Sequence, residues 1–219
     1  MCIPKFANFI KNRYTFRKKY LYSLDILVIK ILIIIGTRPD ALKMYPLINQ
    51  LYKYNNKFNI KVCSTNQHTE LFKQVINTFN IKIDYNLKII RKDNSLEFLV
   101  SNIILELKKV FNDFKPDLIF VHGDTTTAMA ASIVSYYNKI KIFHIEAGIR
   151  SYSLFSPFPE EGNRKIITQL AYKHFAPTKH NFNNLLQEGI DKKNIFVVGN
   201  TIIDLIKKIT SSTMLKSRT

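Results

Sequence analysis

Short runs of apolar residues alternate along the chain with longer stretches in which apolar and polar residues recur at helical spacing. This alternation is typical of strands buried in a parallel sheet that helices cover on both faces. We therefore expect an α/β fold with a doubly wound, mostly parallel, Rossmann-like sheet. The runs predict strands, the third weaker than the rest, at 31–35, 59–64, 85–89, 117–121, 140–144, 174–176 and 195–198.

The segments between these runs carry helix-start signals. Several have a proline at the first helical position or a serine or threonine as the cap residue. From about Thr210 the residues are polar, and we expect a frayed end there. The expected helices begin near Pro39, Thr69, Ser95, Thr125, Pro159 and Lys179.

The beginning of the chain combines a basic, aromatic stretch with the apolar run 26–35. A signal peptide is disfavoured because Asp25 and Lys30 flank or interrupt the run and no small-residue cleavage site follows. We interpret 30–35 as a buried strand, and we predict no membrane span because no uncharged apolar run is long enough. The predicted organisation is a basic extension at 1–29, a Rossmann-like domain at 30–206, and a polar tail or truncated interdomain linker at 207–219. The extension is either an appended arm or the product of an upstream translation start.

Composition excludes several classes of protein. The chain has 219 residues, 46% of them hydrophobic and 22% charged, so it can bury a large core and is not disordered. Six glycines and seven prolines exclude collagen-like and low-complexity chains, and two cysteines exclude a disulfide scaffold and a four-cysteine zinc site. We expect no metal site, two unreactive cysteines and a cytoplasmic location.

The charge balance is strongly basic. Thirty-three Lys and Arg residues against 16 Asp and Glu give a formal net charge of +17, which suits nucleic acid, an anionic membrane or an acidic small molecule. The lysines are scattered among many Asn and Ile residues, as compositional drift across a proteome also produces. A nucleic-acid-binding module is therefore the less favoured alternative, and it predicts salt-sensitive oligonucleotide binding that requires the residues before Lys30.

Ligands of doubly wound sheets bind outside the carboxyl ends of the strands, so the residues that follow each apolar run are candidates for chemistry. After the first run, Gly36 permits a tight turn, the next helix offers amide donors, and Arg38 and Lys43 add positive charge. This combination favours phosphate binding. The alternative is a capped helix with two surface cations, because the segment has neither a G-x-G-x-x-G fingerprint nor a P-loop.

Carboxylates follow two later runs. Asp124 comes after the fourth run and Glu146 after the fifth, so we expect both to face one cleft. The alternatives are a helix N-cap for Asp124 and a buried ion pair with Arg150 for Glu146.

A third acidic candidate, Glu160, begins a helix. The spacing allows Glu160 to pair with Arg164, and Glu161 with Lys165, at i, i+4. A helix-starting acid held by a salt bridge is therefore the alternative to a catalytic role for Glu160.

These motifs form an ordered series along the chain. They are Gly-Thr-Arg-Pro-Asp at 36–40 with Lys43, Asn-Gln-His at 66–68, Gly-Asp-Thr-Thr-Thr at 123–127, and the segments 144–150, 156–164, 175–178 and 198–204. In this order they resemble the non-hydrolysing UDP-N-acetylglucosamine 2-epimerases, and the resemblance extends from about residue 30 to about 206. It implies one half of a two-domain, GT-B-like architecture.

The resemblance also implies a reaction. Family members eliminate UDP from UDP-GlcNAc to give a 2-acetamidoglucal and add UDP back on the other face, which gives UDP-ManNAc without a redox cofactor. Moving a weakly acidic C2 proton between faces requires more than one positioned carboxyl group. A hydrolysing relative, which releases UDP and ManNAc, is the alternative on the same fold.

Residue roles follow from the resemblance alone. It implies that acid–base chemistry falls to three carboxylates, that further residues contact the substrate, and that the segment around His68 binds a regulatory nucleotide sugar. A solvated loop histidine is the alternative for His68. The implied catalytic residues are Asp124, Glu146 and Glu160; the substrate contacts are Gly36, Arg38, Lys43, Thr125, Arg150 and Arg164; the regulatory residues are Gln67 and His68.

Departures from the family pattern concern identity and length. Asp40 stands where Glu is usual, Asn66 where Gly is common, Phe158 where Trp is common and Gly162 where Ala is common. The family has a second Rossmann-like domain after the segment 198–204, and the sequence ends at Thr219 before it. We therefore expect little activity from this chain alone, a homodimer as in the family, and a separately encoded carboxy-terminal domain or an inactive nucleotide-sugar-binding remnant.

Overall fold

The computed structural model describes residues 28–65, 70–87, 89 and 95–216, so the extension and the segment with Gln67 and His68 lie outside the described residues. One parallel sheet has the strand order β3-β2-β1-β4-β5-β6-β7. The strands are β1 (Ile29–Ile35), β2 (Phe58–Ser64), β3 (Tyr85–Asn86), β4 (Leu118–His122), β5 (Lys141–Ile145), β6 (Lys173–Ala176) and β7 (Ile195–Val197).

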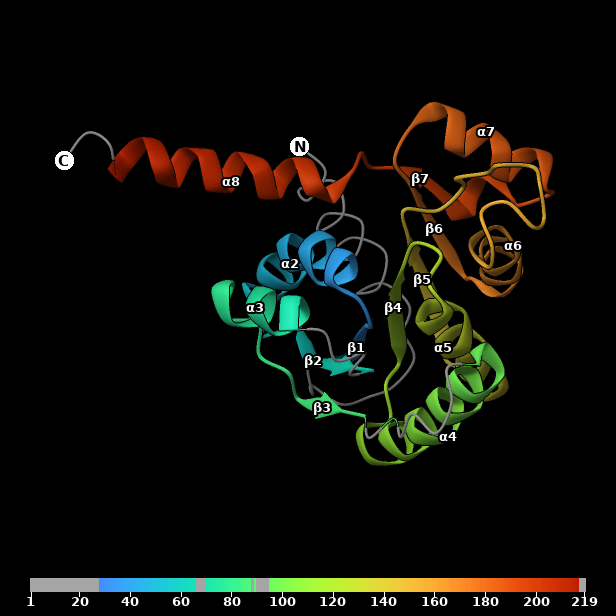
Figure 1. Cartoon of the computed structure of the whole chain (residues 1–219), viewed down its shortest axis with the longest axis horizontal. Helices are drawn as coiled ribbons and strands as arrows, with labels where there is room; N and C mark the ends of the chain where they lie inside the picture. The colour runs from blue at the N-terminus through green and yellow to red at the C-terminus, as the bar shows by residue number, and fades with distance from the viewer. Residues whose placement is uncertain (1–27, 66–69, 88, 90–94, 217–219) are drawn as a thin grey trace, which may run out of the picture.

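Helices cover both faces of the sheet (Figure 1), which is the doubly wound arrangement expected from the sequence. The described helices are α2 (Arg38–Tyr52), α3 (Glu70–Thr78), α4 (Leu96–Phe114), α5 (Thr126–Tyr137), α6 (Glu160–Leu170), α7 (Lys179–Gln187) and α8 (Thr201–Lys216), with a short 3-10 helix at Lys192–Asn194.

The central strand β1 is continuously apolar over residues 31–35, and its packing shows why. Ile31, Ile33 and Ile35 pack into the core beneath α2 and α3, whereas Leu32 and Ile34 pack into the core beneath α4 and α5. Successive side chains of a strand point to opposite faces, so a strand covered on both faces needs apolar residues at every position.

The order of the strands indicates where a ligand site is expected. β1 pairs with β2 on one side and with β4 on the other, and the chain winds in opposite directions from that point. In such sheets a crevice forms at this switch point, outside the carboxyl ends of the strands. Gly36, His122 and Glu146 follow or end β1, β4 and β5 and therefore lie around this crevice.

Two sequence expectations need correction. The third strand is only Tyr85–Asn86, shorter than the predicted 85–89. The frayed end predicted from Thr210 is wrong, because α8 continues as a helix to Lys216 with Leu205 buried. The division of the chain at residues 29 and 206 stays a prediction.

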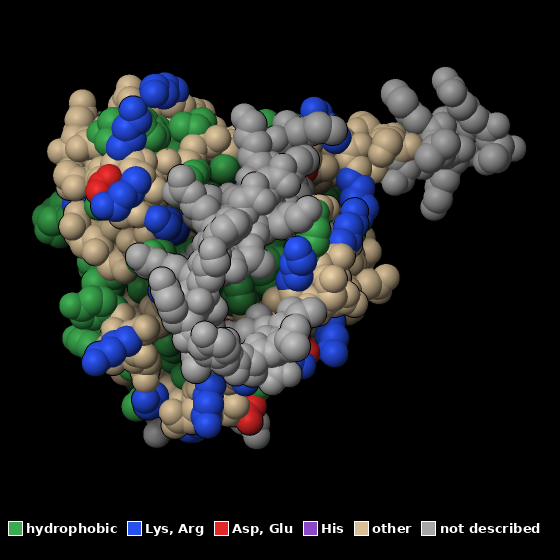
Figure 2. Space-filling view, turned by 180° about the vertical axis from the view of Figure 1, so that it is seen from behind, with side chains coloured by type: hydrophobic (Ala, Val, Ile, Leu, Met, Phe, Trp, Pro, Cys, Tyr) green, Lys and Arg blue, Asp and Glu red, His purple; other side chains and the backbone are tan. Residues whose placement is uncertain are grey.

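No helix in the described part of the chain is long and apolar enough to cross a membrane. Figure 2 shows the face of the molecule opposite to that in Figure 1. Lys and Arg side chains of the described residues are dispersed over several parts of this face and are not gathered in one patch. The nucleic-acid alternative requires the residues before Lys30, most of which lie outside the described residues, so it stays untested.

Gly36 is required by close packing at the end of β1. A Cβ at this position would overlap Thr127 Oγ1 and lie 2.8 Å from Thr65 Oγ1, and these two hydroxyls are themselves 3.0 Å apart. We expect Gly36→Ala to lower the free energy of unfolding by about 1–3 kcal/mol through overpacking. Urea denaturation measures the change.

A glycine of α6 provides the matched control. A Cβ on Gly162 would meet only Leu154 Cδ1, at 3.9 Å, so Gly162→Ala is expected to be neutral or to stabilise by up to about 1 kcal/mol. Equal effects of the two substitutions would contradict the packing role given to Gly36.

Candidate active site

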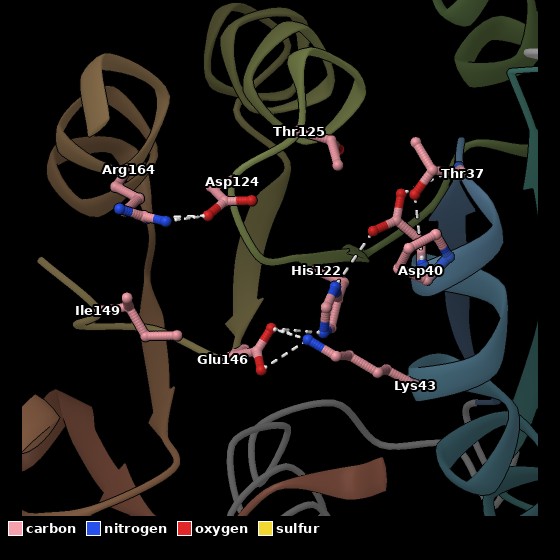
Figure 3. Close-up of a pocket in the computed structure, with 10 residues that line it drawn as sticks. Thr37, Asp40, Lys43, His122, Asp124, Thr125, Glu146, Ile149 and Arg164 are labelled. Atoms are coloured by element: carbon pink, nitrogen blue, oxygen red, sulfur yellow. Dashed lines mark hydrogen bonds and ion pairs between the residues drawn. The ribbon is translucent and has the colours of Figure 1, made fainter. Parts of the chain in front are cut away.

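A cavity of about 460 Å³ opens at the switch point of the sheet. Its walls come from the start of α2, the end of β4, the residues that follow β4 and β5, and α6. Figure 3 shows its polar side chains arranged in two groups, one around Glu146 and one around Asp124. The lining residues are Thr37, Pro39, Asp40, Lys43, His122, Asp124, Thr125, Glu146, Ile149 and Arg164.

Glu146 lies at the centre of the first group. It follows β5 with φ of +63°, a conformation that non-glycine residues adopt rarely and that often occurs at functional sites. Lys43 Nζ donates to both carboxylate oxygens, at 2.8 and 2.7 Å, and Asn200 Nδ2 donates to Oε1 at 2.9 Å. Burial favours the neutral acid, but His122 and Lys43 outweigh it and lower the pKa of Glu146 to about 2.

His122 connects Glu146 to a second carboxylate. Its ring is buried at the end of β4, with Nδ1 3.2 Å from Asp40 Oδ1 and Nε2 3.1 Å from Glu146 Oε2. Burial disfavours the imidazolium, but the hydrogen bonds and charges of Asp40 and Glu146 outweigh it and raise the pKa of His122 to about 9. A charged chain of Asp40, His122, Glu146 and Lys43 therefore forms one wall at neutral pH.

Asp40 also changes the expectation for the first turn. Its Oδ2 accepts hydrogen bonds from the amides of Gly36 and Thr37, and Thr37 Oγ1 accepts from the Asp40 amide, which completes a capping box. Of the amides at the start of the helix, which were expected to meet phosphate, that of Asp40 is thus bonded to Thr37 and Pro39 has none to donate. Arg38 is exposed and is not among the lining residues, whereas Lys43 is.

Asp124 belongs to the second group, where Arg164 Nε and Nη2 donate to Oδ2 at 2.9 and 2.5 Å. Asn163 Nδ2 donates to the main-chain oxygen of Asp124 at 2.9 Å. The N-cap of α5 is Thr125, whose hydroxyl accepts from the Ala128 amide, so the N-cap alternative for Asp124 is wrong. The side chain of Asp124 instead faces the cavity.

Glu160 is not among the residues that line the cavity. The predicted pair of Glu160 with Arg164 is replaced, because Arg164 binds Asp124 and, through Nη1 at 3.0 Å, Glu161. The predicted pair of Glu161 with Lys165 is therefore also wrong. Glu160 Oε2 is buried with no hydrogen-bond partner in the described part of the chain, one helical turn before Arg164 on the same face of α6.

Arg150 is directed into the protein interior instead of the cavity. Its fully buried guanidinium donates to Glu188 from Nε and Nη2 at 2.6 Å, and to Thr168 Oγ1 at 2.8 Å. The alternative pair of Glu146 with Arg150 is wrong, and the implied substrate contact of Arg150 is not supported by this placement. The structure thus brings five of the predicted site residues together in the lining of the cavity: Lys43, Asp124, Thr125, Glu146 and Arg164. Four others are not among the lining residues: Gly36, Arg38, Arg150 and Glu160.

Sequence reasoning missed three residues of the site: His122, Asp40 and Asn200. His122 immediately precedes the Gly-Asp-Thr-Thr-Thr motif at a strand end, and Asp40 occupies the third helical position that a capping box predicts. Both positions could therefore have been identified from the sequence. No sequence signal connects Asn200 with Glu146, which lies 54 residues earlier.

The titrating groups predict how stability depends on pH. His122, with a pKa of about 9 in the folded chain and 6.5 unperturbed, stabilises below pH 6.5 and loses this contribution as pH rises through 9. Burial lowers the pKa of His144 to about 3 and of His174 to about 4, so stability falls as pH drops below 6.5 and the unfolded chain takes up protons. Glu146 adds a loss between about 4.5 and 2.

We therefore expect the free energy of unfolding, measured by urea denaturation, to be highest near pH 6.5. It should fall on both sides by up to about 1.4 kcal/mol per pH unit for each group. His144→Gln should flatten the acidic limb and leave the alkaline limb unchanged. A midpoint that rises steadily from pH 5 to 9 would contradict these assignments.

Comparison with known proteins identifies the family. A family model described as UDP-N-acetylglucosamine 2-epimerase matches residues 50–219. The chain is 50% identical over 177 residues to the UDP-N-acetylglucosamine 2-epimerase of Neisseria meningitidis serogroup A, covering 81% of this chain and 47% of that protein. The Campylobacter jejuni enzyme of the same name is 46% identical over 184 residues, covering 84% of this chain and 48% of that protein.

Solved structures agree with these matches. The crystal structure of UDP-GlcNAc 2-epimerase from Neisseria meningitidis bound to UDP-GlcNAc superposes with a TM-score of 0.81 at 47% identity, covering 86% of this chain and 52% of that one. The Methanocaldococcus jannaschii epimerase in complex with UDP-GlcNAc and UDP gives 0.77 at 38% identity, covering 82% of this chain and 49% of that one. The predicted fold, a Rossmann-like half of a GT-B-like architecture, is confirmed.

The chain spans about half the length of the curated relatives it matches. The residues matched by the family model include Asp124 and Glu146, two of the three carboxylates that line the cavity. The chain belongs to the UDP-N-acetylglucosamine 2-epimerase family.

Proposed function

We propose that the chain supplies the amino-terminal part of a UDP-N-acetylglucosamine 2-epimerase site, which interconverts UDP-GlcNAc and UDP-ManNAc once a carboxy-terminal half is present. The observation that carries the proposal is the meeting of Asp124 and Glu146, each beside a cation, in one cavity at the switch point. The Neisseria relative bound to UDP-GlcNAc supports this substrate class.

The proposed chemistry is an elimination followed by an addition. A carboxylate removes the C2 proton, the C–H electron pair forms the C1–C2 double bond, and the C1–O electron pair leaves with UDP. Addition of UDP to the glycal, with a proton delivered to the opposite face of C2, completes the inversion. Three carboxylates line the cavity, and Asp40 is bonded to the amides of Gly36 and Thr37, so we assign the two proton transfers to Asp124 and Glu146.

Cations of the cavity play two parts in this proposal. Lys43 and Arg164 place positive charge where the diphosphate leaves. Lys43 is bonded to Glu146 and helps to keep that carboxylate weakly basic. A diphosphate that draws Lys43 away would raise the pKa of Glu146 and make it a stronger base for the C2 proton.

A single wall cannot exclude water from a glycal intermediate or order a nucleotide diphosphate from both sides. We therefore expect the isolated chain to bind UDP-GlcNAc weakly and to turn it over little. The test is NMR detection of UDP-ManNAc from UDP-GlcNAc, with the chain alone and with the carboxy-terminal half of the Neisseria relative added.

Product formation only in the mixture is the expected result. Brisk turnover by the isolated chain would contradict the need for a second half. Free ManNAc with UDP would assign the hydrolysing reaction instead, and no turnover in a folded, associated mixture would count against an epimerase site.

We also propose a homodimer and a cytoplasmic location, as the family resemblance implies. Sedimentation equilibrium of the purified chain tests the first, and fractionation of the source cells tests the second. A monomer at micromolar concentration or recovery in the membrane fraction would contradict them.

A further inference from the structure

Asn200 connects the candidate active site to helix α8. It follows Gly199, whose φ of +88° turns the chain out of β7, and it immediately precedes α8. Both polar atoms of its side-chain amide are hydrogen-bonded: Nδ2 donates to Glu146 Oε1 at 2.9 Å, and Oδ1 accepts from the Ile202 amide at 3.1 Å. One amide group therefore binds the carboxylate and caps the helix.

The same helix is attached a second time, further along. Lys208 Nζ lies 2.5 Å from the Tyr45 hydroxyl and 4.6 Å from the centre of its ring, and Leu205 is buried. Tyr45 is on α2, two residues after Lys43, which is the other main partner of Glu146. Figure 1 shows α8 leaving β7 and running over α2, so it bridges the two halves of the sheet above the switch point.

Glu146 is thus held by groups from three directions. Lys43 comes from α2, His122 from β4 and Asn200 from the start of α8. Displacement of α8 would withdraw the Asn200 donor while the other two remain. A carboxylate that loses a hydrogen-bond donor becomes a stronger base and is freer to turn.

We propose that Asn200 is a positioning residue that couples the placement of α8 to the orientation and charge of Glu146. The coupling needs a side chain with a donor and an acceptor at this position. Serine keeps an acceptor for the Ile202 amide but is too short to reach Glu146, and aspartate keeps the cap but places a second negative charge beside the carboxylate. The inference holds whichever reaction the site supports.

The first experiment measures the pKa of Glu146 by carboxyl ¹³C NMR in the full chain. Asn200→Ser is expected to raise this pKa by about one unit, the loss of one donor to a charged group, and Asn200→Asp to raise it further. Asn138→Ser is the matched control, because Asn138 caps the far end of α5 and does not contact the cavity. It should leave the pKa of Glu146 unchanged.

A second experiment separates coupling from a local contact. Tyr45→Phe removes the hydroxyl that binds Lys208 but keeps the ring, and should shift the carboxyl resonance of Glu146 when Asn200 is present. In the Asn200→Ser background the same substitution should produce no shift. Equal shifts in both backgrounds, or an unchanged pKa of Glu146 in folded Asn200→Ser, would overturn the proposal.

Discussion

Replacing Glu146 by glutamine is expected to lower the pKa of His122 from about 9 by one to two units and to reduce turnover of the reconstituted enzyme by at least about 10²-fold. His122 owes its raised pKa to two carboxylates, and the substitution removes the charge of one and keeps its shape. Asp40 remains, so the pKa should fall without reaching that of a buried, unpaired histidine.

Imidazole ¹⁵N NMR of the full chain measures this pKa without requiring activity. Glu106→Gln is the control, because Glu106 pairs with Lys109 on the surface of α4. An unchanged pKa of His122 in the Glu146→Gln variant would show that the charged chain from Asp40 to Lys43 does not exist in solution.

Replacing Glu188 by alanine is expected to destabilise the chain by about 3–5 kcal/mol. The Arg150 guanidinium is fully buried, and Glu188 accepts two of its hydrogen bonds. Removal of one partner leaves a buried charge without compensation, which costs far more than loss of a surface pair. The urea midpoint of unfolding measures the effect.

Asp191→Asn provides the contrast, because the exposed pair of Asp191 with Lys193 lies three residues further on. That substitution should leave the midpoint unchanged. A loss of less than about 1 kcal/mol in Glu188→Ala would mean that water reaches Arg150 when Glu188 is removed.

The sequence predicted the sheet well because its strands are buried on both faces. Residues 31–35 are apolar at every position, and a short run of this kind is typical of a strand covered by helices on both faces. The placement of Asp124 and Glu146 in one cavity also follows from topology, since β4 and β5 are parallel neighbours. The location of the site could therefore be predicted from the expected parallel sheet.

Side-chain pairing was less predictable because local spacing competes with distant partners. The spacing allows Arg164 to bind Glu160 at i, i+4, but two of the Arg164 donors bind Asp124, 40 residues earlier. Proximity in sequence suggested an ion pair of Glu146 with Arg150. Glu146 instead pairs with Lys43, which is 103 residues away. Which charged side chains pair at the end of a sheet depends on how the fold brings distant segments together. Spacing along a single sequence does not reveal this.

The helix α8 was missed for a related reason. Its residues from Thr210 on are polar enough to resemble a frayed tail, and its contacts with α2, such as that of Lys208 with Tyr45, are not revealed by any periodicity.

Solvent-deuterium incorporation at C2 of UDP-GlcNAc tests the central claim most directly, with the chain mixed with the carboxy-terminal half of the Neisseria relative in D₂O. We predict incorporation by the unmodified chain and by Asn138→Ser, and its loss by at least about 10²-fold in Asp124→Asn and in Glu146→Gln. Exchange at an undiminished rate in both carboxylate variants would show that the C2 proton is handled elsewhere.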